Sequence, residues 1–487
     1  MSKRAKEEHN TTVAEQELND QHTATQEQTA TDEQSLQSLT LNHRNVIAVT
    51  LFSMIFGAGN LIFPPLVGAL AGTASFAAIV GFIVSAVGLP IMAVLAVSFA
   101  GGFRQLAGRV SPKFATILAV VIILTIGPLF AIPRTASTSF EMALVPFIHD
   151  GSQQWLQLVY SIVFFAIALV VAQHPEKLAK ILGRFMGPLL IAMIVILFVM
   201  CLLLPHGPIQ PAKGSYAQGA MVQGFLDGYQ TLDLLSTLYF GIIISANIRA
   251  FGVKKESRVR RETGIAGLAT GVMLIVVYGM LGVIGTISGT LQPIDPATAT
   301  GTDVLSNLTT QAFGSAGTVF VGLTFIIACF NVCTGLLSTA SSFFSKQFPT
   351  VFGRKFSYRA WTVLFTFIAL IISNLGLAQI IRLSMPVLEA LYPIAIVLVL
   401  LALLEGPFTS KFRPVYLWTV VFTAIVSISQ CAVSLTAVFG GHLTWLENLL
   451  NYLPFQQQTL GWVLPAIIGT FVGVIVQFVR GNRPVQQ

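Results

Sequence analysis

Residues 56–65 read Phe-Gly-Ala-Gly-Asn-Leu-Ile-Phe-Pro-Pro, and they lie within the first long apolar run of the chain. Pro64 and Pro65 lack an amide donor and disfavour helical geometry in the residue before them. Gly57 and Gly59 lower helix stability and permit unusual backbone torsions. The pattern predicts a membrane helix that is broken at the two glycines. Non-helical backbone at such a depth is tolerated only where protein buries it or where it lines a cavity.

The composition of the whole chain is that of a membrane protein. Of its 487 residues, 54% are hydrophobic and 10% are charged, whereas soluble domains carry about 25% charged residues. An ordinary soluble enzyme is therefore excluded. The four cysteines lie within apolar runs and are interpreted as packing residues; they are Cys201, Cys329, Cys333 and Cys431.

Residues 1–43 differ from the rest of the chain. They hold eight acidic and three basic residues and no aromatic residue. Such a segment cannot bury enough apolar surface to offset its ordering entropy. We expect a disordered acidic and polar tail, and its lack of an apolar stretch argues against a signal peptide.

From Arg44 onward, long apolar runs alternate with short polar loops. A helix needs about 20 apolar residues to cross a bilayer. The sequence therefore predicts an all-α integral membrane protein with 12 transmembrane helices. The predicted spans are residues 45–70, 75–100, 114–146, 155–172, 183–205, 221–250, 262–290, 315–345, 358–378, 382–404, 413–440 and 460–480.

The distribution of basic residues predicts the orientation of these spans. One set of loops holds 20 lysines and arginines, whereas the opposite set holds only Lys213 and Arg382. Cytoplasmic loops carry the excess of positive charge. We therefore expect a multi-pass plasma-membrane protein with both termini in the cytoplasm. Lipid head groups, and not nucleic acid, are the expected partners of the net charge of +7.

A second candidate break lies in span 6, at residues 236–241, Ser-Thr-Leu-Tyr-Phe-Gly. Paired interruptions in corresponding spans of two halves indicate the binding site of a secondary transporter. Five spans separate the two candidate breaks, so the second half would be inverted. We predict repeats over residues 44–205 and 206–404, followed by two extra spans and a cytoplasmic C-terminus in residues 405–487.

Five stretches of the sequence carry a resemblance to a known family. They are FGAGNLIFPP (56–65), GPLFAIPRTASTSFE (127–141), GYQTLDLLSTLYFG (228–241), ACFNVCTGLLSTASSFF (328–344) and VLEALYPIAIVL (387–398). Together they resemble the bacterial branched-chain amino acid:cation symporters, over roughly residues 40–480. The resemblance implies a LeuT-like five-plus-five inverted repeat with broken helices 1 and 6. It also implies import of leucine, isoleucine and valine, driven by Na⁺ or, in some members, H⁺.

The resemblance further implies where the coupling ion binds. Asn60 and Thr237 match positions beside the substrate carboxylate in LeuT-type transporters. The LeuT-type pattern carries an arginine after this asparagine, whereas this chain has residues 62–64, Ile-Phe-Pro, so its outer gate must be built differently. The implied cation ligands are Ser53, Phe56, Asn60, Thr237, Gly335, Ser338 and Thr339.

A branched-chain amino acid is a zwitterion with an aliphatic side chain. Its carboxylate suits a half-helix N-terminus, where free amides and the helix dipole attract anions. Its ammonium suits carbonyl groups freed by the breaks, so no charged side chain is needed. Its aliphatic group needs apolar walls. The expected substrate-binding residues are Phe56, Gly57, Ala58, Gly59, Asn60, Ile132, Tyr239, Phe240 and Gly241.

Ionisable residues inside the spans are costly and by default functional. Arg134 follows Pro133 deep in span 3, and we expect it to pair with Asp233 or Glu141 as a gate or a structural clamp. Glu389 is expected near the outer vestibule. No histidine lies within a span, so proton coupling would depend on the carboxylic acids, among them Asp227.

Other functions remain to be weighed. The chain has no Gly-Lys dipeptide of a P-loop and no His-Glu pair, which argues against a nucleotide-driven pump and a metalloprotease. The chain is thus not expected to be an enzyme or to hold a covalent cofactor. The alternatives are an H⁺-coupled carrier of the same fold for another neutral amino acid or a nucleobase, and a channel.

Overall fold

The computed structural model describes residues 39–148, 152–173, 187–253, 255–291, 294–296, 299–351, 353–404 and 413–480. Most of the predicted tail, residues 1–43, lies outside this range. Helix α2 (Leu41–Ile55) begins inside the predicted tail, because the Thr40 hydroxyl caps it by accepting from the His43 amide at 3.3 Å. The first span therefore starts three residues before the predicted boundary at residue 44.

The first span is interrupted where the glycines predicted a break. Helix α2 ends at Ile55, and helix α3 (Ala58–Ala71) begins after two extended residues, Phe56 and Gly57. The side chain of Asn60 accepts a hydrogen bond from the Gly57 amide at 2.9 Å and so satisfies one amide left free at the start of α3. The two prolines lie inside α3 and do not end it.

The break in span 6 lies earlier than predicted. The span consists of α12 (Tyr216–Asp227), η6 (Gly228–Thr231) and α13 (Asp233–Ala250), with Leu232 at φ +65° between the last two. Residues 236–241 are helical, which corrects the prediction. Ser236 and Thr237 donate to carbonyl oxygens one turn back in their own helix, so these hydroxyls are compatible with helix and do not break it.

The remaining elements complete a helical membrane protein. Seven described helices are long and apolar enough to cross a membrane, and three shorter apolar ones accompany them; the count of 12 spans stays a prediction. Span 3 bends at Gly127, and α15 bends at Gly314, where φ is +58°. The strands form one small antiparallel hairpin. The elements are η1 (Gly72–Ala74), α4 (Ser75–Ile83), η2 (Val84–Gly88), α5 (Leu89–Ala100), α6 (Phe103–Gly108), α7 (Pro112–Leu124), η3 (Thr125–Leu129), α8 (Ala131–Ala143), η4 (Val145–Phe147), α9 (Gln153–Ala172), α11 (Gly187–Leu202), α14 (Glu256–Leu291), α15 (Gly301–Gln347), β1 (Thr350–Val351), β2 (Arg354–Lys355), α16 (Tyr358–Ser373), α17 (Leu377–Leu403), α18 (Arg413–Val438), α19 (Thr444–Leu450), η7 (Gln456–Gln458) and α20 (Val463–Arg480).

The halves of the broken spans lie among α8, α14 and α15. Helix α3 packs along α14 and α15, while α12 packs on α4 and α13 on α5. Glycines permit the closest approach: a Cβ atom on Gly285 would collide with the Pro65 backbone, and one on Gly301 with Ile62. Small residues allow such backbone contact between membrane helices. The pairing holds α3 in place beside the break.

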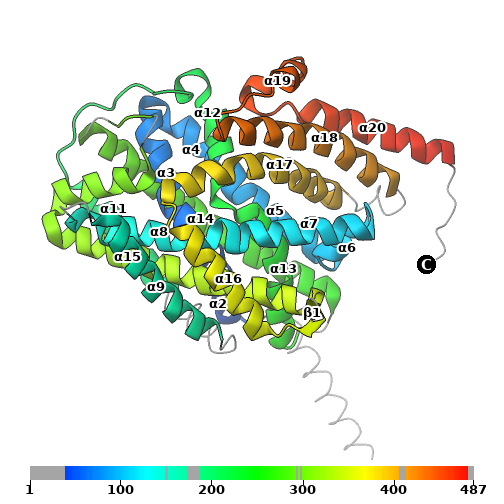
Figure 1. Ribbon diagram of the computed structural model, residues 1–487, viewed down its shortest axis with the longest axis horizontal. Helices are drawn as coiled ribbons and strands as arrows, with labels where there is room; N and C mark the ends of the chain where they lie inside the picture. The colour runs from blue at the N-terminus through cyan, green and yellow to red at the C-terminus, as the bar shows by residue number, and fades with distance from the viewer. Residues whose placement is uncertain are drawn as a thin grey trace, which may run out of the picture.

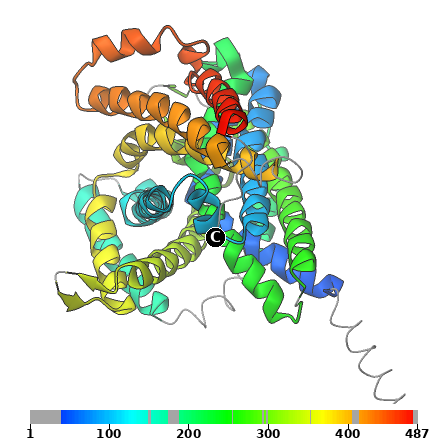
Figure 2. The same ribbon diagram turned by 90° about the vertical axis from the view of Figure 1, so that its right-hand side faces the viewer.

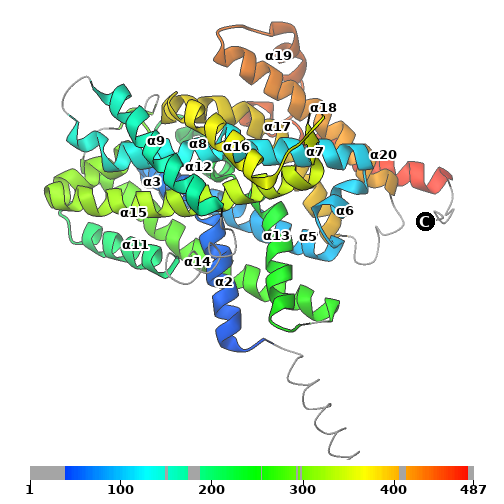
Figure 3. The ribbon, with the colours of Figure 1, turned by 60° about the horizontal axis from the view of Figure 1, so that its bottom comes forward.

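The last helices cover one side of this core. Helices α17, α18 and α20 pack side by side (Figure 1). The short α19 projects beyond them, as the turned views show (Figure 2, Figure 3). None of α18, α19 or α20 contributes to the cavity described below, so the site belongs to the two predicted repeats.

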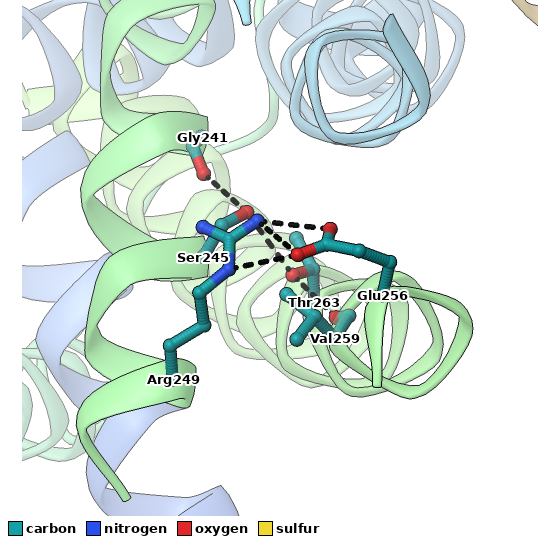
Figure 4. Close-up of polar contacts among 6 residues, drawn as sticks. All are labelled: Gly241, Ser245, Arg249, Glu256, Val259 and Thr263. Atoms are coloured by element: carbon teal, nitrogen blue, oxygen red, sulfur yellow. Dashed lines mark hydrogen bonds and ion pairs between the residues drawn. The ribbon is translucent and has the colours of Figure 1, made fainter. Parts of the chain in front are cut away.

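Polar contacts tie the start of α14 to its neighbours. Arg44 in α2 donates through Nε and Nη2 to the buried Glu262 carboxylate, each at 2.6 Å. Arg249 in α13 pairs with Glu256 at 2.9 Å, beside the Ser245–Thr263 hydroxyl contact (Figure 4). The start of α14 is thereby linked to both α2 and α13.

The far end of α14 has a different neighbour. Lys213 donates through Nζ to the Ile294 carbonyl at 3.3 Å, and its amide donates to Leu70 at the end of α3. Lys213 and Arg44 thus contact opposite ends of α14. The membrane side that each end faces stays a prediction.

Candidate functional site

The two interrupted spans meet at one central cavity. Its volume is about 20 Å³, which is room for a single water molecule. Both breaks contribute to it, together with α8 and α15. The lining residues are Met54, Ile55, Gly57, Ala58, Gly59, Asn60, Ala131, Arg134, Thr135, Thr231, Leu232, Asp233, Ser236, Val332 and Leu336.

One wall of the cavity is a buried hydrogen-bond cluster. The Asn60 amide Nδ2 donates to Asp233 Oδ2 at 2.6 Å and also contacts the Tyr278 hydroxyl. Tyr278 donates to the same carboxylate oxygen at 3.1 Å. All three side chains are at most 1% exposed. The cluster joins the start of α3, the start of α13 and the middle of α14.

Arg134 contributes a cationic side chain to the lining. It is 3% exposed, and its Nε and Nη1 atoms have no hydrogen-bond partner. Its guanidinium lies over the Phe63 ring at 5.5 Å. In the part of the chain that the structure describes, Arg134 makes no ion pair. The expected pairing with Asp233 or Glu141 is therefore not formed, although Asp233 lines the same cavity.

The predicted substrate residues divide into two groups. Gly57, Ala58, Gly59 and Asn60 line the cavity, and the buried Phe56 stacks on Phe52 and Tyr278. The other predicted residues lie outside the lining: Tyr239, Phe240 and Gly241 follow the break in span 6, and Ile132 lies in α8. The Tyr239 hydroxyl donates to the Ala119 carbonyl, Gly241 faces Val94, and neither the buried Phe240 nor the buried Ile132 belongs to the lining.

The structure shows which protein groups the predicted cation ligands contact. Ser53 contacts α15 through Asn331, whose Nδ2 donates to the Ser53 carbonyl at 2.9 Å and to its hydroxyl at 2.8 Å. Thr237 and Thr339 donate within their own helices, Ser338 accepts from Tyr358, and a Cβ on Gly335 would meet open space.

The remaining predicted acids lie away from the central cavity. Glu141 accepts from Thr302 at 3.0 Å and lines a separate polar cavity of about 450 Å³ with Asp303 and Gln153. Glu389 accepts from Ser434 and so links α17 to α18. Asp227 contacts Tyr216. None of these three acids lies against Arg134.

Sequence reasoning missed three residues near the breaks. Tyr278, Asn331 and Gln230 are each at most 3% exposed. Asn331 keeps a buried Oδ1 without a partner, and so does Gln230 with its Oε1. Asn331 and Gln230 both lie in the family-like stretches, where each is a polar amide among apolar residues. That contrast could have marked them as candidate site residues. Tyr278 is a lone tyrosine in span 7, and only the fold brings it to Asp233.

Solved structures share this architecture. The chain aligns with a closed conformation of Mhp1, a nucleobase-cation-symport-1 family transporter with bromovinylhydantoin bound, at a TM-score of 0.59 and 13% identity, covering 91% of this chain and 94% of that one. A Na⁺-coupled sialic acid symporter aligns at 0.54 and 15% identity, with 90% of each chain covered. At these identities the likeness shows the fold, and it confirms the LeuT-like class.

The fold and the cavity at its breaks define a multi-pass membrane transporter. Residues 41–480 match the family described as "Branched-chain amino acid transport protein". The branched-chain amino acid permease BrnQ of Bacillus subtilis is 35% identical over 89% of this chain and 97% of its own length. The branched-chain amino acid transport system 2 carrier protein of Pseudomonas aeruginosa is 34% identical over 88% of this chain and 95% of its own length.

The chain belongs to this family of branched-chain amino acid transport proteins. The family resemblance noted in the sequence is thereby confirmed, and so is the prediction that the chain is not an enzyme.

Proposed function

We propose that the protein is a secondary active symporter that imports leucine, isoleucine and valine with Na⁺ by alternating access. The observation that carries the proposal is the meeting of two broken spans at a buried cavity in a chain of this family. Broken helices place half-helix ends and unbonded backbone groups at the binding site of such transporters. Both termini are assigned to the cytoplasm on the basis of the loop charges.

The lining of the cavity suits an aliphatic amino acid. Met54, Ile55, Leu232, Val332 and Leu336 supply aliphatic surface, and the breaks supply polar groups. Few placed polar groups in a mainly apolar pocket are typical of small-molecule sites. Because the cavity holds about 20 Å³, the surrounding helices must move apart before leucine can enter.

The choice of Na⁺ rests on oxygen ligands. Hydroxyls that donate within a helix, such as those of Thr237 and Thr339, keep lone pairs for a cation. Backbone carbonyls at a break also coordinate Na⁺ in transporters of this architecture. The buried Asp233 beside Asn60 favours the alternative, in which a proton on this carboxylate drives transport.

Leucine uptake into proteoliposomes of the purified protein tests the proposal. We expect accumulation under an inward Na⁺ gradient without a proton gradient. Accumulation under a proton gradient alone would reject Na⁺ coupling and direct attention to Asp233. Counterflow with unlabelled leucine, alanine and uracil then tests the substrate, and exchange by uracil or alanine but not leucine would reject the branched-chain assignment.

Substitution of Ser338 tests the proposed ion site. We expect Ser338→Ala to raise the Na⁺ concentration for half-maximal leucine uptake by about tenfold, as is common when a supporting ligand group is lost. Ser342→Ala, one turn further along α15, is the matched control and should leave the Na⁺ dependence unchanged. Equal Na⁺ dependence in both variants would remove Ser338 from the site.

A further inference from the structure

The central cavity has an unusual electrostatic composition for a membrane interior. Arg134 is buried there, and its Nε and Nη1 atoms lack hydrogen-bond partners. A buried charge without a partner is strongly unfavourable, and buried cations are normally paired. Asp233, the only acid among the described lining residues, accepts hydrogen bonds from Asn60 and Tyr278. Among the described residues, no acceptor therefore binds the Nε and Nη1 donors of this guanidinium.

A second positive feature lies beside this side chain. Arg134 Nη2 would be 2.9 Å from a Cβ atom on Gly59, the second residue of α3. The first amides of a helix have no partner within the helix and carry the positive end of its dipole. Asn60 satisfies only the Gly57 amide. The start of α3 and the guanidinium thus converge on the same side of the cavity.

We infer that Arg134 and the start of α3 form the subsite for the α-carboxylate of the transported amino acid. This assignment rests on the proposed function. It places the charged Arg134 side chain beside the substrate carboxylate, for which the sequence predicted backbone amides alone. A guanidinium matches a carboxylate with two parallel donors. Asp233 in the same lining would then face the ammonium group, so that the zwitterion fits between opposite charges.

The glycine at position 59 fits this assignment. Any larger side chain there would occupy the space between the start of α3, Arg134 and the Gln230 carbonyl oxygen, which is 3.1 Å from the position of a Cβ atom. A bound carboxylate requires close approach to both the backbone and the guanidinium. The absence of a side chain at Gly59 leaves that approach open.

Ligand selectivity separates this role from a purely structural one. L-leucinol keeps the ammonium and isobutyl groups of leucine but replaces the carboxylate with a hydroxymethyl group. Thermal-shift titrations of the purified protein would give the affinities for L-leucine and L-leucinol. The wild type should favour leucine by about 100-fold or more, because losing a charged partner leaves Arg134 unsatisfied.

Arg134→Gln should lower the ratio of the affinities for L-leucine and L-leucinol by at least about tenfold, because the lost interaction is made only with the carboxylate of leucine. A structural role predicts instead that both affinities fall by the same factor and that the ratio survives, which would overturn the assignment. Arg382→Gln, on an exposed residue, is the matched control and should keep the wild-type ratio.

Two further outcomes are informative. If Arg134→Gln does not elute as a folded protein, Arg134→Lys decides, because lysine keeps the charge but loses the forked donors. A ratio reduced by about tenfold in that variant supports the subsite, and an unchanged ratio overturns it. If the wild type does not bind leucine, the proposed substrate itself fails, and the assignment fails with it.

Discussion

Replacement of Gly59 by valine is expected to lower leucine uptake by about 100-fold, the scale of loss that misplacement by about 1 Å causes in a built site. A Cβ atom at this position would lie 2.9 Å from Arg134 Nη2 and 3.1 Å from the Gln230 carbonyl oxygen. The added methyl groups must push the break of span 6 away from α3. Initial uptake rates in proteoliposomes, normalised to the amount of folded protein, measure the effect.

Gly279 provides the matched control for this substitution. It lies in α14, where a Cβ atom would meet nothing within 4 Å. Gly279→Val makes the same change in intrinsic helix propensity without narrowing the cavity, so its uptake should stay near that of the wild type. Equal loss in the two variants would mean that the effect comes from helix stability and not from the space at the breaks.

Replacement of Asp233 by asparagine is expected to reduce leucine uptake by about 30-fold or more, since breaking a buried hydrogen-bonded charge site typically costs over 2 kcal/mol. The substitution keeps the shape of the side chain and one acceptor for Asn60 and Tyr278. It removes the only negative charge among the described residues that line the cavity. Uptake at leucine concentrations well below saturation measures the loss directly.

Glu389→Gln supplies the comparison for Asp233→Asn. Glu389 is also a carboxylic acid in an apolar helix, but it contacts Ser434 of α18 and lies outside the central cavity. Its replacement should change uptake by no more than about twofold, as for substitutions away from a functional feature. If Glu389→Gln is as damaging as Asp233→Asn, the loss cannot be attributed to the cavity.

The class of fold was predictable from local chemistry, whereas the second break was not. Residues 56–65 concentrate glycine and proline, and local backbone preference alone placed the interruption of span 1 correctly. Span 6 is interrupted at Leu232, where the left-handed conformation is unfavourable for such a residue. The Leu232 side chain is buried, with 1% of its surface exposed. Propensity could not indicate it, because tertiary packing decides it.

The same difference decides which of the predicted substrate residues lie at the cavity. Residues 57–60 of the first break line it, whereas Tyr239, Phe240 and Gly241 follow the second break by two helical turns and lie outside the lining. The lack of hydrogen-bond partners for Arg134 Nε and Nη1 could not be predicted from the sequence either. Sequence shows that a charge is buried, and only the packing of α8 against the breaks shows that its Nε and Nη1 atoms have no hydrogen-bond partner among the described residues.

The joint at Phe56 and Gly57 has a mechanical consequence. Helices α2 and α3 share no continuous ladder of hydrogen bonds across it, so a change of angle at this joint would break no hydrogen bond within either helix. Arg44 lies twelve residues before Phe56, which is about 18 Å along a helix axis. A rotation of α2 by about 10° would move the Arg44 backbone by about 3 Å over that length. Such a movement would separate the Arg44 guanidinium from Glu262 unless both side chains followed it, so the pair, with its two contacts at 2.6 Å, holds α2 at its present angle to α14.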